Sequence, residues 1–360
     1  MWQNLEVTLK KVDDTRLKGK PDQNSLGFGR YFTDHMFMMN WDQQNGWHDA
    51  RICPFEDFRV SPAAMVFHYG QAIFEGMKAY RGKDDQIFLF RPKDNLQRMN
   101  DSALRMCMPR LPAEKVLKSL KALLYLERDW VPSLFGSSLY IRPTMIAVEP
   151  MLGVRPSSSY CFFIILCPVG AYYPEGFEPT KIYISDTYVR AVKGGVGQAK
   201  TAGNYGASLL ASEEAKKAGC TQVLWLDACE HKYIEEVGTS NIFFLLGDRL
   251  VTPPLEGSIL PGITRDSVMT LAREWGIEVV ERQIGIDEVI EACASGELRE
   301  SFATGTAAVI SPVGEFHYQE TVYPVNTGEA GELARKFFEE MQLRQYGHRE
   351  DGYGWSVRVC

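Results

Sequence analysis

The alternation of strand-like and helix-like patterns constrains the fold of this 360-residue chain most strongly. In the first half, short runs rich in β-branched and aromatic residues, such as "QIFLFRP" and "CFFIILCPV", alternate with stretches whose apolar residues recur every three or four positions. Glycine, prolines and glutamates interrupt the pattern at "AYYPEGFEPT", residues 171–180, and a second alternation follows. The chain is therefore predicted to adopt an α+β (mixed α/β) fold. We expect a smaller N-terminal domain at residues 1–170, a linker at 171–180 and a larger C-terminal domain at 181–360.

Several stretches carry the spacing of an amphipathic helix. We expect helices at residues 93–108, 113–131, 208–220, 264–276, 287–296 and 328–347. Strand runs lie between them, including "AIFEGMKAYRG" in the first half and "ESFATGTAAVISPV" in the second. The order of these strands in a sheet does not follow from the alternation, so the topology stays open.

The composition is that of an ordinary soluble protein and limits the classes of partner. Apolar residues make up 45% of the chain and charged residues 24%, and the net charge of −7 argues against nucleic acid as a partner. The N-terminus lacks the apolar core of a signal peptide, and the apolar run at residues 159–173 is too short to span a membrane. The eight cysteines show no CxxC pair and no zinc-ligand spacing. We therefore expect reduced thiols, a cytoplasmic location and no metal.

"VKGGVGQAKTAGNYG", residues 192–206, places five glycines around Lys200 and Tyr205. A Walker A loop requires glycine directly before its lysine, but Ala199 precedes Lys200. A Rossmann fingerprint that begins at Gly195 would have its third glycine where Lys200 stands. Both nucleotide-binding interpretations miss by one residue. A flexible surface turn with a solvated lysine is the alternative that the stretch itself leaves open.

Small neighbours suit a lysine that acts on a flat ligand. Glycine allows the backbone to approach a ligand closely and to adopt positive φ angles. A lysine with a lowered pKa can attack an aldehyde and form a Schiff base, as in enzymes that use pyridoxal phosphate (PLP). Such enzymes also need a carboxylate at the pyridine nitrogen, a donor to the phenolate oxygen, and an arginine with N–H and hydroxyl donors at the phosphate.

Motifs along nearly the whole chain resemble those of the branched-chain amino acid aminotransferases, which are PLP enzymes of fold type IV within the class IV aminotransferases. The matching stretches, in the family's order and spacing, are "HYGQAIFEGMKAYRG", "LFRPKDNLQRM", "SLYIRPTMIAVEPMLGV", "CPVGAYYPEG", "GGVGQAKTAGNYG", "QVLWLDA", "EEVGTSNIFF", "LVTPPLEGSILPGITR" and "FATGTAAVISPV". Each stretch is modest evidence, but together they are highly specific. The resemblance implies a transferase that reversibly moves the amino group of L-leucine, L-isoleucine or L-valine to 2-oxoglutarate, giving branched 2-oxo acids and L-glutamate.

Roles toward the cofactor follow from the resemblance, residue by residue. Lys200 corresponds to the lysine that forms the Schiff base and later moves a proton between the substrate's Cα and the cofactor. Glu236, directly before "VGT", corresponds to the carboxylate at the pyridine nitrogen. Glu235 competes with it, and in a strand the two would point to opposite faces. The other implied contacts are Tyr205 at the phenolate oxygen and, at the phosphate, Arg98, Ile263, Thr264 and Thr306.

The resemblance also implies a pocket that accepts both branched apolar side chains and glutamate. Its aromatic lining positions are Phe28, Tyr69, Phe74, Tyr140 and Tyr172. Arg142, in "YIRP", would bind the side-chain carboxylate of glutamate. Thr239 and the "TGTA" turn, with the N–H groups of Thr306 and Ala307, would hold the α-carboxylate. The implied assembly is a homodimer with shared active sites, in which Tyr69, Arg142 and Val154 serve the neighbouring subunit.

One departure and two alternatives accompany this interpretation. Some family members carry a redox-active CxxC pair after the "GTA" turn, but Ala308 and Ser311 stand there, which predicts no thiol regulation at this position. Other fold type IV enzymes, a D-amino acid aminotransferase or an aminodeoxychorismate lyase, would share the lysine, the glutamate and the phosphate turn. From another class, a nucleotide-binding regulatory module with a degenerate glycine loop also stays open.

Overall fold

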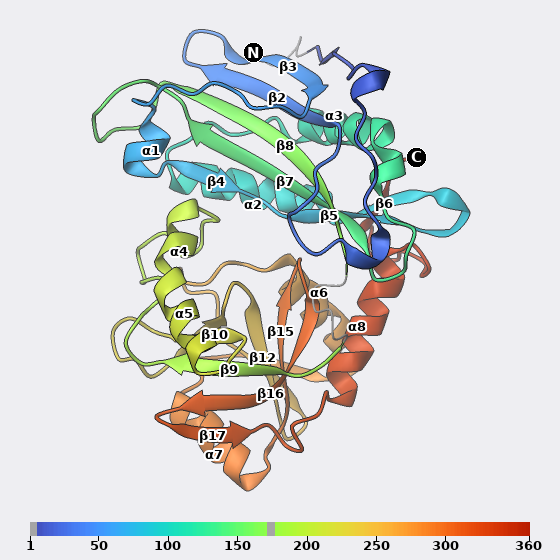
Figure 1. The fold of residues 1–360 in the computed structure, drawn as a ribbon. Helices are drawn as coiled ribbons and strands as arrows, with labels where there is room; N and C mark the ends of the chain where they lie inside the picture. Colours follow the sequence, from blue (N-terminus) through green and yellow to red (C-terminus); the bar gives the residue numbers. More distant parts are fainter. Residues whose placement is uncertain (1–5, 171–176) are drawn as a thin grey trace. The chain divides into compact units, whose positions relative to one another are not determined.

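The computed structural model describes residues 6–170 and 177–360, which form two compact units (Figure 1). The first unit consists of residues 6–170, Ala199–Ala202 and Gln342–Cys360. The second consists of residues 177–198 and Gly203–Met341. Both combine a large sheet with helices, and the predicted mixed α/β class is confirmed.

The first unit is built on a sheet with the strand order β1-β3-β2-β8-β7-β5-β6-β18, with β4 paired to β7. The strands are β1 (Thr8–Leu9), β2 (His35–Asp42), β3 (Gly46–Pro54), β4 (Ala72–Phe74), β5 (Met77–Arg81), β6 (Ile87–Phe90), β7 (Ser138–Ala147), β8 (Ser159–Val169) and β18 (Ser356–Arg358). Its α-helices are α1 (Met65–Tyr69), α2 (Pro92–Arg105) and α3 (Ala113–Leu126). Short 3₁₀ turns lie at Asp14–Arg16, Gln23–Ser25, Lys83–Asp85 and Arg128–Trp130. Most neighbouring strands are antiparallel, but β1 and β3 are parallel.

One face of this sheet packs against α2 and α3 and forms the hydrophobic core. Strand β7 shows how the alternation of a strand divides its residues: Leu139, Ile141 and Met145 lie in that core. Tyr140 and Arg142 therefore project from the other face. The side chains that carry chemistry on β7 thus share the face that α2 and α3 do not cover.

The second unit contains a sheet with the strand order β11-β10-β9-β16-β15-β12-β13-β14, with β17 paired to β16. The strands are β9 (Thr180–Ser185), β10 (Gln222–Leu226), β11 (Ile234–Val237), β12 (Asn241–Leu246), β13 (Arg249–Thr252), β14 (Glu278–Glu281), β15 (Leu298–Gly305), β16 (Val309–Tyr318) and β17 (Thr321–Pro324). The helices are α4 (Ala202–Ala207), α5 (Leu209–Lys217), α6 (Ile263–Glu274), α7 (Ile286–Ser295) and α8 (Glu332–Gln345). None of the helices in the described ranges has the length and apolar character that a membrane span requires.

Two expected strand runs are each divided in the structure. "ESFATGTAAVISPV" forms the hairpin β15–β16, in which Gly305 pairs with Val309 and the "TGTA" stretch makes the turn. "AIFEGMKAYRG" forms β4 and β5, which both pair with β7 and are separated by Glu75 and Gly76. In both cases the only turn-forming residue at the interruption is a single glycine, Gly76 or Gly305, which a strand pattern can also contain.

The units differ from the predicted domain segments at two places. Ala199–Ala202, which includes Lys200, belongs to the first unit, and so does Gln342–Cys360. The C-terminal segment is held there because β18 pairs with β6 and the hydroxyl of Tyr346 donates to the carbonyl of Ser137 at 2.6 Å. Pairing between residues so far apart in the chain leaves no local sequence pattern.

Candidate functional site

Lys200 is fixed by its backbone to β4 and α2 of the first unit. Its carbonyl accepts from the N–H of Phe74 at 3.0 Å, and its own N–H donates to the hydroxyl of Ser102 at 2.9 Å. The hydroxyl of the next residue, Thr201, donates to the carbonyl of Ala72 at 2.8 Å. Three contacts to two elements hold the backbone of this lysine, so the solvated-loop alternative does not apply.

Lys200 is half-buried, and its Nζ lies 5.2 Å from the ring centroid of Phe74. Burial lowers the pKa of Lys200 to about 8, because an ammonium ion loses hydration there. The guanidinium groups of Arg98 and Arg142 act in the same direction, whereas Glu75 and Tyr140 oppose the shift. A larger share of this amine is therefore unprotonated near neutral pH than for a lysine in water. Lys200 is therefore suited to act as a nucleophile and a base.

Arg98 lies on α2 and is held by a buried carboxylate. Its Nε donates to Glu75 at 2.8 Å and its Nη2 at 2.9 Å, which is a bidentate pair. Glu75 is fully buried and Arg98 is 7% exposed. Such a pair fixes the plane of the guanidinium, whose five N–H donors exceed the number that Glu75 uses.

Arg142 joins three of the predicted aromatic residues in one cluster. Its Nη2 donates to the hydroxyl of Tyr140 at 3.0 Å, and its Cζ lies 4.6 Å from the ring centroid of Phe74. Phe28 contacts the ring of Tyr140 edge-on at 4.9 Å. Because Phe74 contacts both Arg142 and Lys200, the structure brings these five predicted residues together.

Three other predicted residues lie outside this cluster. Tyr69 ends α1 and is 39% exposed, and Val154 lies on the loop between β7 and β8 and is 90% exposed. Tyr172 falls outside the described residues. Of the predicted aromatic lining residues, the structure therefore brings Phe28, Phe74 and Tyr140 together within the first unit.

In the second unit, Glu236 is buried on β11, where it pairs with Trp225 of β10. Its Oε2 lies 2.8 Å from Nη1 of Arg190, and its Oε1 accepts from Nδ2 of Asn241 at 3.1 Å. One carboxylate oxygen of Glu236 thus lies in an ion pair with a guanidinium, and the other accepts a hydrogen bond from a side-chain amide.

Glu235 has a different environment, because the register of β11 shifts between Trp225 and Leu226 of its partner strand. Its Oε1 accepts from the hydroxyl of Ser258, and it lines a cavity of about 230 Å³. Burial raises the pKa of Glu235. The structure therefore gives the two neighbouring glutamates separate partners.

The start of α6, which holds Ile263 and Thr264, is linked to Glu236 through Asn241. Asn241 donates to the carbonyl of Leu260 at 3.0 Å as well as to Glu236. Gly262 precedes the helix, and a Cβ there would lie 1.9 Å from Oδ1 of Asn241. Only glycine fits at this N-cap, and it leaves the helix without a side-chain cap.

Two turns carry the remaining predicted residues of the second unit. Gly238, with φ 55°, and the exposed Thr239 form the turn between β11 and β12. Thr306 and Ala307 are half-buried in the turn between β15 and β16, which ends at Val309 with φ 65°. A β-branched residue rarely adopts that angle, and such strain concentrates at functional sites. Tyr205 lies half-buried on α4.

Comparisons with known proteins assign the family. Residues 72–316 match the family described as Amino-transferase class IV. Branched-chain-amino-acid aminotransferase 2 of Bacillus subtilis is 54% identical over 343 residues, which cover 95% of this chain and 94% of the relative. This chain belongs to the branched-chain-amino-acid aminotransferases. The family prediction is confirmed, and the alternative fold type IV activities are not favoured.

Solved structures of similar fold carry the same name. A crystal structure of Escherichia coli branched-chain amino acid aminotransferase is 28% identical, with a TM-score of 0.75, and the match covers 91% of this chain and 99% of that one. The T.th. branched-chain amino acid aminotransferase complexed with N-(5'-phosphopyridoxyl)-L-glutamate is 26% identical, with a TM-score of 0.73, covering 93% and 99%. The fold type IV assignment is thereby confirmed.

In this branched-chain aminotransferase, Lys78 is a candidate site residue that sequence reasoning missed. It lies on β5 directly opposite Tyr140 of β7, so it shares the face that carries Arg142. It is 7% exposed, and burial lowers its pKa to about 8. The sequence feature that could have identified Lys78 is its place in "FEGMKAY", where a lysine stands between apolar residues of an expected strand.

Replacement of Gly76 by alanine should disturb the aminotransferase through Tyr140. A Cβ at Gly76 would lie 2.1 Å from the Tyr140 hydroxyl and 3.0 Å from its Cζ, so the ring that Arg142 contacts must move. We expect a cost of about 1–3 kcal/mol in unfolding free energy and a lower kcat/KM. Urea denaturation and steady-state kinetics measure both. Gly19→Ala, with nothing within 4 Å of its Cβ, is the matched control, and equal behaviour of the two variants would contradict the prediction.

Proposed function

We propose that this chain transfers the amino group of L-leucine, L-isoleucine or L-valine to 2-oxoglutarate, reversibly, with PLP as its cofactor. The observation that carries the proposal is the half-buried Lys200, with its lowered pKa, in one cluster with Phe74 and Arg142. That cluster combines a reactive amine, an apolar wall and a cation for a second carboxylate. Membership in the branched-chain family supports the substrate class.

The residues of the chain fit PLP by the chemistry of their donors. Lys200 is an amine for the aldehyde, the buried Glu236 is a carboxylate for the pyridine nitrogen, and Tyr205 is a phenol for the ring oxygen. The phosphate would be held by Arg98, Thr306 and the start of α6 at Ile263 and Thr264, where a glycine cradle leaves no competing cap. The T.th. relative, whose solved structure is a complex with a phosphopyridoxyl group, supports the same assignment.

When bound, PLP supplies an electron sink that stabilises negative charge at the substrate's Cα. The protein must then move one proton at that carbon. Lys200 is suited to this task because its Nζ has a pKa near neutrality and a fixed backbone.

The pocket must accept an apolar side chain in one half-reaction and a carboxylate in the other. Phe28, Phe74 and Tyr140 supply apolar contact surface for leucine, isoleucine or valine. Arg142 and Lys78, on the same face of the sheet, supply cations for the carboxylate of glutamate. We assign the α-carboxylate, common to all substrates, to Thr239 and to the N–H groups of Thr306 and Ala307.

The proposal includes a homodimer with shared active sites and a cytoplasmic location. Phe67, Tyr69, Leu152 and Val154 expose apolar side chains on α1 and the loop after β7, as a subunit interface would require. The cysteines that the structure describes are free thiols, which suits a reducing compartment.

Replacement of Lys200 by alanine tests the proposal directly. We expect loss of nearly all transamination, because the nucleophile and the proton carrier are one group. Borohydride reduction of the native protein, followed by peptide mass spectrometry, should place a phosphopyridoxyl group on Lys200. Lys193→Ala, in the same glycine stretch but exposed and paired with Glu256, should retain activity and labelling. A label on another lysine would refute the assignment.

Glu236→Gln and Glu235→Gln form a matched pair. Glu236→Gln removes a buried charge from the proposed pyridine contact, so we expect kcat to fall by about 10²-fold while PLP stays bound. Glu235→Gln changes a residue that lines the separate cavity and should leave kcat within about twofold. Absorbance of bound PLP and steady-state kinetics distinguish the two variants. The reverse order of effects would assign the cofactor contact to Glu235.

Arg142→Gln tests the two-substrate pocket. Glutamate places a carboxylate where leucine places methyl groups, and an unpaired buried carboxylate is costly. We therefore expect the glutamate half-reaction to lose about 2–3 kcal/mol more in kcat/KM than the leucine half-reaction. Single-turnover kinetics on each half-reaction give the difference. Equal losses would mean that Arg142 is structural or binds the common α-carboxylate.

A further inference from the structure

Residues 10–34 form a strap in the first unit that contains 3₁₀ turns but no α-helix or strand. The strap follows β1 and leads into β2, and it includes Phe28, which contacts Tyr140 of the candidate site. An irregular segment has no ladder of backbone hydrogen bonds to hold it. Its position must therefore come from side-chain contacts together with isolated backbone hydrogen bonds, such as that from the N–H of Thr33 to the carbonyl of Leu166 at 3.1 Å.

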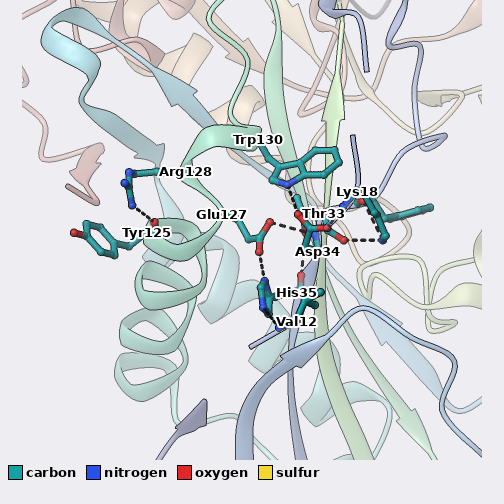
Figure 2. Close-up of polar contacts among 10 residues, drawn as sticks. Val12, Lys18, Thr33, Asp34, His35, Tyr125, Glu127, Arg128 and Trp130 are labelled. Atoms are coloured by element: carbon teal, nitrogen blue, oxygen red, sulfur yellow. Dashed lines mark hydrogen bonds and ion pairs between the residues drawn. The ribbon is translucent and has the colours of Figure 1, made fainter. Parts of the chain in front are cut away.

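A buried polar network lies where the strap meets β2, as Figure 2 shows. Asp34, His35, Glu127 and Trp130 are each less than one-tenth exposed. Glu127, at the end of α3, contacts Nδ1 of His35 and accepts from the N–H of Asp34 at 3.2 Å. The indole N–H of Trp130 donates to Oδ2 of Asp34 at 2.9 Å. The carboxylate of Asp34 is thus tied to Trp130, which lies just after α3, and the carboxylate of Glu127 ties the end of α3 to Asp34 and His35.

The same network binds the backbone of the strap at two points. Oδ1 of Asp34 accepts from the N–H of Lys18 at 2.8 Å. Nε2 of His35 accepts from the N–H of Val12 at 2.9 Å, so the ring proton sits on Nδ1, which faces Glu127. The Lys18 ammonium also donates to the carbonyl of Thr33 at 2.9 Å. These bonds tie Val12 and Lys18, in the first half of the strap, to residues 33–35, where the strap ends and β2 begins. They therefore close the intervening chain into loops.

The middle of the strap is held separately. Gln23 Oε1 accepts from the N–H groups of Ser133 and Leu134 at 2.9 and 3.0 Å. Leu26 is 2% exposed, and the carbonyl of Gly27 accepts from the N–H of Gly170 at 3.3 Å. Phe28 follows directly and is 43% exposed. Contacts at Gln23, Leu26 and Gly27 therefore hold the backbone immediately before Phe28.

We propose that Asp34, His35 and Glu127 are positioning residues that act through the strap to hold Phe28 against Tyr140 and so set the apolar wall of the substrate pocket. The proposal rests on the proposed function, since Phe28 matters only if a branched side chain binds there. The hydrogen bonds that tie Asp34 into the network run to Lys18, Glu127 and Trp130, so the network is distinct from the residues assigned to the cofactor.

The test compares Asp34→Ala with Glu300→Ala. Both remove a carboxylate that accepts from backbone N–H groups, but Glu300 binds Leu333 and Ala334 at the start of α8. We expect Asp34→Ala to raise KM for leucine about tenfold, the scale of one apolar pocket contact, with kcat within about twofold. Glu300→Ala should leave KM unchanged. Hydrogen exchange of peptides spanning Val12 and Lys18 should accelerate in Asp34→Ala alone.

A double-mutant cycle with Phe28→Ala tests whether Asp34 acts through Phe28. Phe28→Ala should raise KM by a similar factor, and Asp34→Ala combined with it should add nothing further. Gln23→Ala serves as the variant that spares the buried network, and it should raise KM in the same direction. Additive effects, or an unchanged KM in Gln23→Ala and Asp34→Ala despite faster strap exchange, would overturn the positioning role. Absence of leucine turnover in the unmodified protein would instead overturn the proposed function.

Discussion

The partial burial of Lys200 among charged and aromatic side chains is the constraint on which the candidate site depends. An ammonium ion loses favourable hydration when it is buried, and here it also lies near the guanidinium groups of Arg98 and Arg142. The protein tolerates this because Glu75 neutralises Arg98 and because three backbone contacts hold the segment in place. The lowered pKa of Lys200 is thus a consequence of packing.

Local environment also distinguishes the two adjacent glutamates, Glu235 and Glu236. A regular strand would place Glu235 and Glu236 on opposite faces, and the register shift on β11 adds distinct partners for each. Glu236 faces Arg190 and Asn241 in the interior, whereas Glu235 faces Ser258 and a separate cavity. A buried carboxylate paired with a guanidinium suits the proposed role at a pyridine nitrogen.

Glycine appears in the site where a side chain would collide, at two points in particular. Gly76 leaves room for the hydroxyl of Tyr140, and Gly262 leaves room for Asn241 beside the start of α6. Each of these neighbours in turn orients a charged group, Arg142 or Glu236. The glycines therefore act on chemistry indirectly, through the polar side chains they admit.

The sequence by itself determined the mixed α/β class and the family, because motif order and periodicity are local properties, and it predicted Lys200 as the central lysine. It also indicated most of the long helices, but it missed β1, β3, β17, β18, α1 and α4, and it joined β4 to β5 and β15 to β16. Only the tertiary structure placed Ala199–Ala202 and the C-terminal segment with the first unit. Only the tertiary structure showed Lys78 beside Tyr140 and the buried contacts of Asp34 and Glu127. These features depend on which distant residues share a face or a dry environment, and burial and strand register exist only once the chain has folded.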